Sequence, residues 1–216
     1  PGSTFKSLVS AIALEENITE TSISQDFYCS GYETIGGRKI RCWSTKPHKY
    51  ETLTQALANS CNPAFMQLGQ RIVGQIGLER LYDYYDAFGL FDKVGTSFAR
   101  AYSGSFHDIE KMGPVELATT SFGENFTISP LQLIAAIGSI ANDGVYVEPR
   151  IVKQVENPDT NSIEQTEVVE KVQVVSKETA TKVKSMMQSV VTEGTGRHAK
   201  VDGYSIGGKS GTSEPA

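Results

Sequence analysis

The chain has 216 residues, 39% of them hydrophobic and 21% charged, a balance typical of a globular protein. The net charge is −5, and the absence of a basic cluster argues against nucleic acid as a partner. No apolar run is long enough to cross a bilayer, and no secretory leader is recognised. The three cysteines can form at most one internal disulfide.

The beginning of the chain favours a buried helix, because apolar residues recur there at helical spacing. They are Phe5, Leu8, Val9, Ile12 and Ala13. Ser3 stands at the amino end and Lys6 three residues on, so their side chains share one face. A serine hydroxyl needs a base to become a nucleophile, and a lysine deprotonated by burial and a second cation can serve. Alone, however, an S-x-x-K string more often marks a helix cap and a solvated lysine.

The remaining elements follow from periodicity, caps and turn residues. Residues 18–50, punctuated by glycines, predict an irregular, hairpin-like excursion. Helices are predicted from about Thr52, over 62–77, 78–88 and 130–140, and from Ser176 past Val190. Residues 92–113 are expected to be irregular and 157–161 to form a turn. Strands are expected over 145–155, with an interruption at Pro149, and over 204–212.

Two further strings complete a candidate active site. Ser60-Cys61-Asn62 would relay a proton through Ser60 and hold a substrate amide through Asn62, although for this string on its own an Asn cap before a proline is the favoured interpretation. Lys209-Ser210-Gly211-Thr212 would bind a substrate carboxylate and admit a peptide backbone at the glycine, although polar residues on an edge strand are the plainer interpretation. The three strings in this order favour a serine acyl-transfer enzyme.

The motifs resemble the transpeptidase domain of class B penicillin-binding proteins, and the resemblance covers nearly the whole chain. It is supported by Ser121-Phe122-Gly123, by Thr127 to Gln132, by Ala141-Asn142-Asp143-Gly144 and by Glu193-Gly194-Thr195-Gly196. The stretch from Cys42-Trp43 to Asn62-Pro63 is similar to septal and sporulation members of Gram-positive spore formers. Which of these two roles applies stays open.

The resemblance implies an α/β fold, in which a helical lobe lies beside a sheet packed by helices. Residues 1–216 would be part of one transpeptidase domain, whose strands before residue 1 and after residue 216 are missing, so the sheet is incomplete. It implies acylation of Ser3 by a D-Ala-D-Ala stem peptide, with backbone N–H groups of Ser3 and Thr212 as the oxyanion hole, then cross-linking to a second stem peptide. β-Lactams would acylate the same serine.

The resemblance also implies a setting for this reaction. The domain would lie on the extracytoplasmic face of the membrane, anchored by a segment outside this chain, and work beside a glycosyltransferase of wall synthesis. Acyl transfer itself requires no cofactor. The competing hypotheses are a serine β-lactamase, weakened by the lack of an E-x-x-L-N string, and a non-catalytic β-lactam sensor.

The excursion contains a candidate metal site. Cys29, Cys42 and His48 offer the thiolate and imidazole ligands that zinc prefers, and Asp26 is the nearest carboxylate for a fourth position, with Cys61 as the alternative. Zinc there would be structural. Some clostridial members of the family similarly bind zinc near the active site. Two buried thiols beside an unrelated histidine, or a disulfide between Cys29 and Cys42, are the other interpretations.

Overall fold

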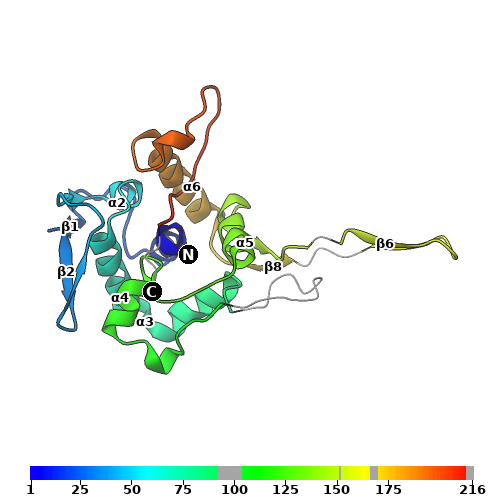
Figure 1. The fold of residues 1–216 in the computed structure, drawn as a ribbon, viewed down its shortest axis with the longest axis horizontal. Helices are drawn as coiled ribbons and strands as arrows, with labels where there is room; N and C mark the ends of the chain where they lie inside the picture. Colours follow the sequence, from blue (N-terminus) through cyan, green and yellow to red (C-terminus); the bar gives the residue numbers. More distant parts are fainter. Residues whose placement is uncertain (92–103, 151, 166–169, 213–216) are drawn as a thin grey trace.

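The computed structural model describes residues 1–91, 104–150, 152–165 and 170–212. Its centre is helix α1 (Lys6–Glu15), and hairpins project outward from the helical body (Figure 1). Four helices contact α1, namely α2 (Leu53–Ala58), α3 (Asn62–Ala87), α5 (Pro130–Ala141) and α6 (Lys177–Thr192). The helices predicted from periodicity and caps are therefore present, and they surround the one that begins beside Ser3.

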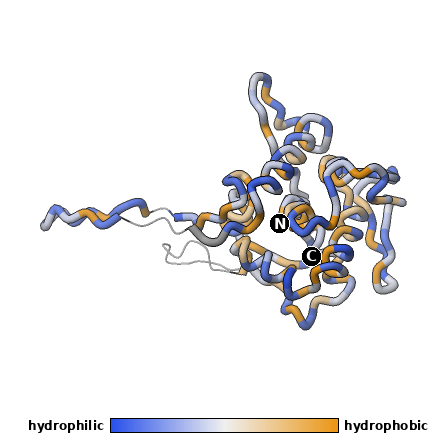
Figure 2. The backbone as a smooth tube through the Cα atoms, turned by 180° about the vertical axis from the view of Figure 1, so that it is seen from behind, coloured by the Kyte–Doolittle hydropathy of each residue, from blue (hydrophilic) through white to orange (hydrophobic). Residues whose placement is uncertain are grey.

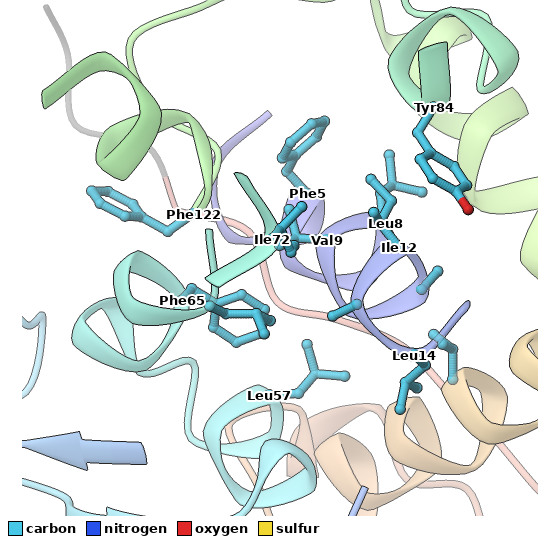
Figure 3. Close-up of a cluster of buried hydrophobic side chains, with 14 of the residues drawn as sticks. Phe5, Leu8, Val9, Ile12, Leu14, Leu57, Phe65, Ile72, Tyr84 and Phe122 are labelled. Atoms are coloured by element: carbon cyan, nitrogen blue, oxygen red, sulfur yellow. The ribbon is translucent and has the colours of Figure 1, made fainter. Parts of the chain in front are cut away.

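Helix α1 is buried along almost its whole length, from Lys6 to Leu14. A 3-10 turn, η1 (Gly2–Phe5), leads into it and contains Ser3. Apolar side chains from α2 and α3 close around it (Figure 3); among them are Leu57, Phe65, Ile72 and Tyr84. Full burial of one such side chain stabilises the fold by about 1.5–3 kcal/mol. Because α1 is enclosed by apolar neighbours, the lysine in its first turn is buried with it.

Helix α3 is interrupted at Gly77, where φ is 79° and ψ is 168°. The break confirms the division predicted at this glycine, because a positive φ costs glycine little. Before α3, Thr52 caps α2 in a capping box with Gln55, which satisfies backbone N–H groups at the helix start. No helix in the described part of the chain is both long and apolar enough to span a membrane.

The excursion over 18–50 forms two antiparallel ladders, as its glycine-punctuated sequence predicts. Strand β1 (Phe27–Cys29) pairs with β4 (Lys49–Glu51), and β2 (Tyr32–Ile35) pairs with β3 (Arg38–Arg41). Gln67 of α3 binds both parts, because its amide donates to Tyr28 O at 2.7 Å and to Glu33 Oε1 at 2.5 Å. The excursion is thus held against α3 by hydrogen bonds as well as by its buried residues.

The described part of the segment expected to be irregular, residues 104–113, is irregular apart from one 3-10 turn. Residues 92–103 lie outside the described residues; after them come η2 (Ile109–Lys111) and a short helix, α4 (Pro114–Thr120), which no periodic pattern predicted. Helix α4 is too short to show a helical repeat, and Pro114 at its first turn is the only local signal. Helix α5 begins as predicted, with Ser129 in a capping box with Gln132.

The strand expected over 145–155 is two separate strands. Strand β5 (Val145–Val147) pairs with β8 (Glu170–Gln173), while β6 (Gln154–Asn157) pairs with β7 (Ser162–Gln165) in an arm that projects from the body (Figure 1). Proline at 149 cannot donate to a ladder, which separates the two strands. The predicted turn at 157–161 closes the arm, and Figure 2 shows that the arm is mainly hydrophilic while hydrophobic segments gather in the body.

Residues 204–212, predicted as a strand, form no strand and pair with none among the described residues. They are held instead by η1 and α6. The Gly208 N–H donates to Met187 O at 3.1 Å, and a Cβ built on Gly211 would lie 3.0 Å from the methyl carbon of Thr4. The expected multi-stranded sheet is therefore incomplete, and the described strands form four two-stranded ladders. After α6, η3 (Arg197–Ala199) leads into this segment.

Candidate active site

Ser3 and Lys6 lie at the junction of η1 and α1, one turn apart. Lys6 Nζ is 3.1 Å from Ser3 Oγ. The amine does not reach solvent, because the side chain of Lys6 is 0% exposed. The spacing that sequence reasoning predicted as one shared helix face is thus a hydrogen bond in the folded chain.

Ser60 and Asn62 meet Lys6 from the loop between α2 and α3. Lys6 Nζ donates to Ser60 O at 2.8 Å and to Asn62 Oδ1 at 2.7 Å, and it lies 3.1 Å from Ser60 Oγ. Ser60 has a φ of 55°, a left-handed conformation that is uncommon for a residue with a side chain. This conformation turns both its carbonyl and its hydroxyl toward the amine.

These contacts fit an uncharged amine. A backbone carbonyl and an amide oxygen can only accept, so Ser60 O and Asn62 Oδ1 engage the two N–H groups of a neutral Lys6. Its lone pair is then left for a hydroxyl, and the hydroxyls of Ser3 and Ser60 are the two that lie within reach. Asn62 therefore orients the lysine, a role that sequence reasoning, which assigned it to a substrate amide, did not foresee.

Burial and, to a smaller extent, the positive charge of Lys209 together lower the pKa of Lys6 to about 7. Desolvation disfavours the ammonium form, and a like charge adds to the effect. Burial also lowers the pKa of Lys209 to about 8. Near neutral pH a substantial share of Lys6 is therefore unprotonated, while Lys209 stays mainly charged.

The third string contacts the same Ser60 hydroxyl. Lys209 Nζ donates to Ser60 Oγ at 3.0 Å and to Ser210 O at 2.9 Å. Ser210 Oγ lies 2.8 Å from Thr195 Oγ1, and the Thr195 N–H donates to Ala58 O at 2.9 Å. Thr195 is a site residue that sequence reasoning named only as part of a family string; a threonine between two glycines gives no independent signal.

Two glycines permit the close approach of three chain segments around Ser3. The Gly2 N–H donates to Gly123 O at 2.9 Å. A Cβ on Gly2 would lie 2.4 Å from Thr212 O, and one on Gly123 only 1.8 Å from Gly2 O. The backbone of Thr212 can therefore lie against the turn that contains Ser3, which is the arrangement that an oxyanion hole of the Ser3 and Thr212 N–H groups requires.

The motif residues open onto one cleft of about 950 Å³. Ser3, Ser60 and Asn62 line it together with Ser210 and Thr212. Its remaining walls come from β3 and the residues after it, from the α4 end, and from the loop after α6; they are Lys39, Ile40, Arg41, Cys42, Trp43, Thr119, Phe122, Glu124, Thr195 and Arg197. A volume of this size accommodates a peptide segment or a drug-sized molecule.

A cluster of potential metal ligands lies beside the cleft. One ligand atom from each of four residues, Cys29, Cys42, His48 and Cys61, lies within 4.8 Å of the others. All three thiols are free and buried. Hydrogen bonding by the Cys61 thiol lowers the pKa of Cys29 to about 6 and that of Cys42 to about 5, which favours the thiolate form that binds metal.

Asp26, the first choice for the fourth ligand, is outside this cluster, and Cys61 takes the position. Arg71 holds the Asp26 carboxylate, with Arg71 Nη1 at 2.7 Å from Oδ1, and Thr19 binds its other oxygen. The neighbour of the cluster is instead Glu51, which is 3% exposed. Its Oε2 has no hydrogen-bond partner among the described residues and lies 3.8 Å from His48 Nδ1. A buried, unsatisfied carboxylate oxygen beside three thiols and an imidazole fits a bound cation.

Known proteins that are similar to this chain agree with the kind of site that the geometry indicates. The family model described as the penicillin binding protein transpeptidase domain matches residues 1–216, and the chain belongs to this family. It is 39% identical over 215 residues to stage V sporulation protein D of Bacillus subtilis (strain 168), which covers 99% of this chain and 32% of that protein. This similarity confirms the predicted likeness to sporulation-type class B members.

Two further relatives support the assignment. The chain is 29% identical over 215 residues to the probable peptidoglycan D,D-transpeptidase PenA of Neisseria meningitidis (serogroup A), covering 98% of this chain and 33% of that protein. A crystal structure of penicillin binding protein 3 of Mycobacterium tuberculosis complexed with aztreonam has a TM-score of 0.86 at 29% identity, covering 97% of this chain and 47% of that chain. The chain thus spans about a third of the length of the curated relatives it matches, and its fold is confirmed as the expected one.

Proposed function

We propose that this protein cross-links peptidoglycan as a serine D,D-transpeptidase, with residues 1–216 forming part of its transpeptidase domain. The contacts of Lys6 carry the proposal. Two oxygens that can only accept hold the N–H groups of the amine, so its lone pair faces the hydroxyls of Ser3 and Ser60. This arrangement supplies a general base to a serine that otherwise has none.

In the first half-reaction, Ser3 Oγ attacks the carbonyl carbon of the penultimate D-alanine of a stem peptide while Lys6 Nζ accepts the hydroxyl proton. The N–H groups of Ser3 and Thr212 stabilise the charge that develops on the carbonyl oxygen. The C–N bond to the terminal D-alanine breaks. Ser60, which contacts both lysines, passes the proton to the departing amine.

The remaining residues of the third string bind the substrate. Lys209 and the hydroxyls of Ser210 and Thr212 face the terminal carboxylate, and Gly211 lets the peptide backbone come close. In the second half-reaction an amine of another stem peptide attacks the ester of Ser3, which forms the cross-link and frees the serine. A β-lactam would acylate Ser3 in the same way, but its opened ring would not depart.

Labelled penicillin tests the proposal. The protein should form a long-lived adduct on Ser3, identified by peptide mass spectrometry, and Ser3→Ala should form none. Thermal unfolding of Ser3→Ala should match that of the wild-type protein, which checks that its fold is intact. Rapid loss of the label with release of hydrolysed penicillin would instead identify a β-lactamase. A stable adduct without cross-linking of lipid-linked precursor would identify a β-lactam sensor.

The proposed reaction also implies a cellular location. Cross-linking occurs where the wall is assembled, so we place the domain on the outer side of the cell membrane, anchored through a segment outside this chain and supplied with glycan strands by a glycosyltransferase. Similarity to a sporulation protein supports a role in the spore wall. Deletion of the gene should then spare vegetative division and impair the spore wall; a septation defect would contradict this role.

We also propose that the four-residue cluster holds a structural zinc ion. Cys29, Cys42, Cys61 and His48 would supply four ligands of the type found in closed structural zinc sites. Zinc would order the loop-rich excursion, which forms only short ladders of its own. Metal analysis of the purified protein should find about one equivalent of zinc. Protein that contains no zinc at stoichiometric level, with all three thiols free, would refute the site.

A further inference from the structure

The cleft has a positively charged border although the whole chain is acidic. Three cations line it, namely Lys39, Arg41 and Arg197, whereas the net charge of the chain is −5. Among the described residues that line the cleft, Glu124 is the one carboxylate. Neither Lys39 nor the two arginines forms an ion pair within the described part of the chain.

The hairpin of β2 and β3 presents two of these cations on one face. Lys39 and Arg41 are two residues apart in β3, so their side chains point to the same side of the ladder. Arg38 belongs to the other side, where its partner Ile35 is buried, and it is not among the residues that line the cleft. Lys39 Nζ lies 3.6 Å from the centre of the Tyr32 ring, a cation–π contact that restrains the ammonium group.

The hairpin is also fixed in place, as a binding wall must be. Glu33 accepts a hydrogen bond from Gln67 of α3 at 2.5 Å, and a Cβ on Gly36, at the tip of the hairpin, would lie 3.1 Å from Val115 of α4. The main-chain N–H of Cys42 donates to Gly31 O at 2.8 Å and continues the hairpin toward the thiol cluster. Both cations of β3 therefore stand on a wall anchored to two helices.

We infer that Lys39, Arg41 and Arg197 form an anion-binding subsite. It recognises a free side-chain carboxylate on the stem peptide, in addition to the terminal carboxylate bound at the third string. This inference rests on the proposed function and names the substrate class: peptides whose internal residues keep ionised carboxylates, as opposed to amidated ones. Cations that form no ion pair within the protein gain most from an anionic ligand in a partly enclosed cleft.

Two D-Ala-D-Ala peptides that differ only in one internal side chain, a free carboxylate or its amide, test the inference. Each peptide competes with labelled penicillin for Ser3, and the protection constant is measured for both. One partly exposed ion pair is worth up to about 1 kcal/mol, so the free carboxylate should protect about fivefold better. The preference should shrink in high salt, because exposed charges are screened.

Matched variants locate the subsite. Arg41→Gln should remove most of the preference and Arg41→Lys should restore it, while Arg38→Gln on the opposite face of the same hairpin should leave it unchanged. Arg38 is exposed and is not among the residues that line the cleft, so Arg38→Gln should label with penicillin at the wild-type rate, and the protection constants of each Arg41 variant are referred to that variant's own labelling rate. Normal labelling with equal protection by the two peptides would overturn the subsite alone, whereas failure of the wild-type protein to label at all would overturn the proposed function.

Discussion

Lys6 and Lys209 share one hydroxyl, because their Nζ atoms lie 3.1 and 3.0 Å from Ser60 Oγ. Two positive charges that close to one another are unfavourable in a buried site. Burial lowers the pKa of both lysines, and Lys209 lowers that of Lys6 further, to about 7. The more deeply buried amine thus becomes the base, while the one on the cleft side keeps its charge for a carboxylate.

The pH dependence of acylation should be bell-shaped. The neutral form of Lys6 is the active one, so the rate should rise as pH increases through about 7. Lys209 must remain protonated, so the rate should fall as pH increases through about 8. Because the two groups interact, the limbs belong to the pair. Stopped-flow measurement of penicillin acylation from pH 5 to pH 10, about the range that spans both limbs, checks this profile.

A variant separates the two limbs. Lys209→Gln removes the neighbouring positive charge, so the pKa of Lys6 should increase toward its ordinary value and the acidic limb should move to higher pH. The rate at every pH should also be lower, because the carboxylate of the substrate loses its partner. An acidic limb at an unchanged position in Lys209→Gln would show that the two lysines do not interact electrostatically.

Loss of the Lys6 amine should slow acylation by about 10²–10⁴-fold, the usual contribution of a general base. Lys6→Met is the cleaner variant, because it fills the buried volume that Lys6→Ala would leave empty. The measurement is the second-order rate constant for penicillin labelling, with thermal unfolding as the test of folding. Lys177→Met, at a side chain that is 74% exposed, is the control and should label normally; normal labelling by Lys6→Met would refute the role of the base.

Gly123→Ala should destabilise the protein and slow acylation together. Gly123 has a φ of 93°, and an added Cβ would lie 1.8 Å from Gly2 O, so the turn beside Ser3 has to move. The expected loss is at least about 1 kcal/mol, since a strained left-handed position and a backbone clash are combined. Denaturant unfolding and penicillin labelling measure the two effects.

Gly74→Ala provides the control for this substitution. Gly74 lies within α3, and an added Cβ would meet nothing within 4 Å. Alanine favours the helix over glycine, so stability should rise by about 0.5–1 kcal/mol. If the two variants lose stability equally, the packing of Gly123 against Gly2 is not what fixes the turn.

Glu51→Gln should weaken zinc binding at the proposed site by about 10–100-fold, the usual effect of removing a charged neighbour of a ligand. The substituted side chain can still accept the 2.8 Å hydrogen bond that Asn59 donates to Oε1, but it loses the charge of the unsatisfied Oε2. Competition with a chromophoric chelator measures the affinity. Glu79, an exposed acidic residue of α3, provides the control, and Glu79→Gln should leave the zinc affinity unchanged. Equal affinity in both variants would exclude Glu51 from the site.

The sequence alone determined the local structure and the identity of the reactive groups. Helical spacing and caps predicted α1, α5 and α6, Gly77 marked the break in α3, and the three strings named Ser3, Lys6, Ser60 and Lys209. These are short-range signals: a cap, a repeat or a glycine acts within a few residues. Where no such signal exists, as in α4 and the pairing of β5 with β8, the prediction was absent or wrong.

Tertiary structure decided which of the named groups meet and in what state. Lys6 and Ser60 are 54 residues apart, and Lys209 is another 149 residues beyond, so no local pattern could place both amines on one hydroxyl. No local pattern could show either that Cys61, and not Asp26, is the fourth member of the cluster with Cys29, Cys42 and His48. Asp26 is instead paired with Arg71. Burial has the same origin: a lysine in the first turn of a helix is charged in water, and only the apolar helices packed around α1 make its neutral form accessible.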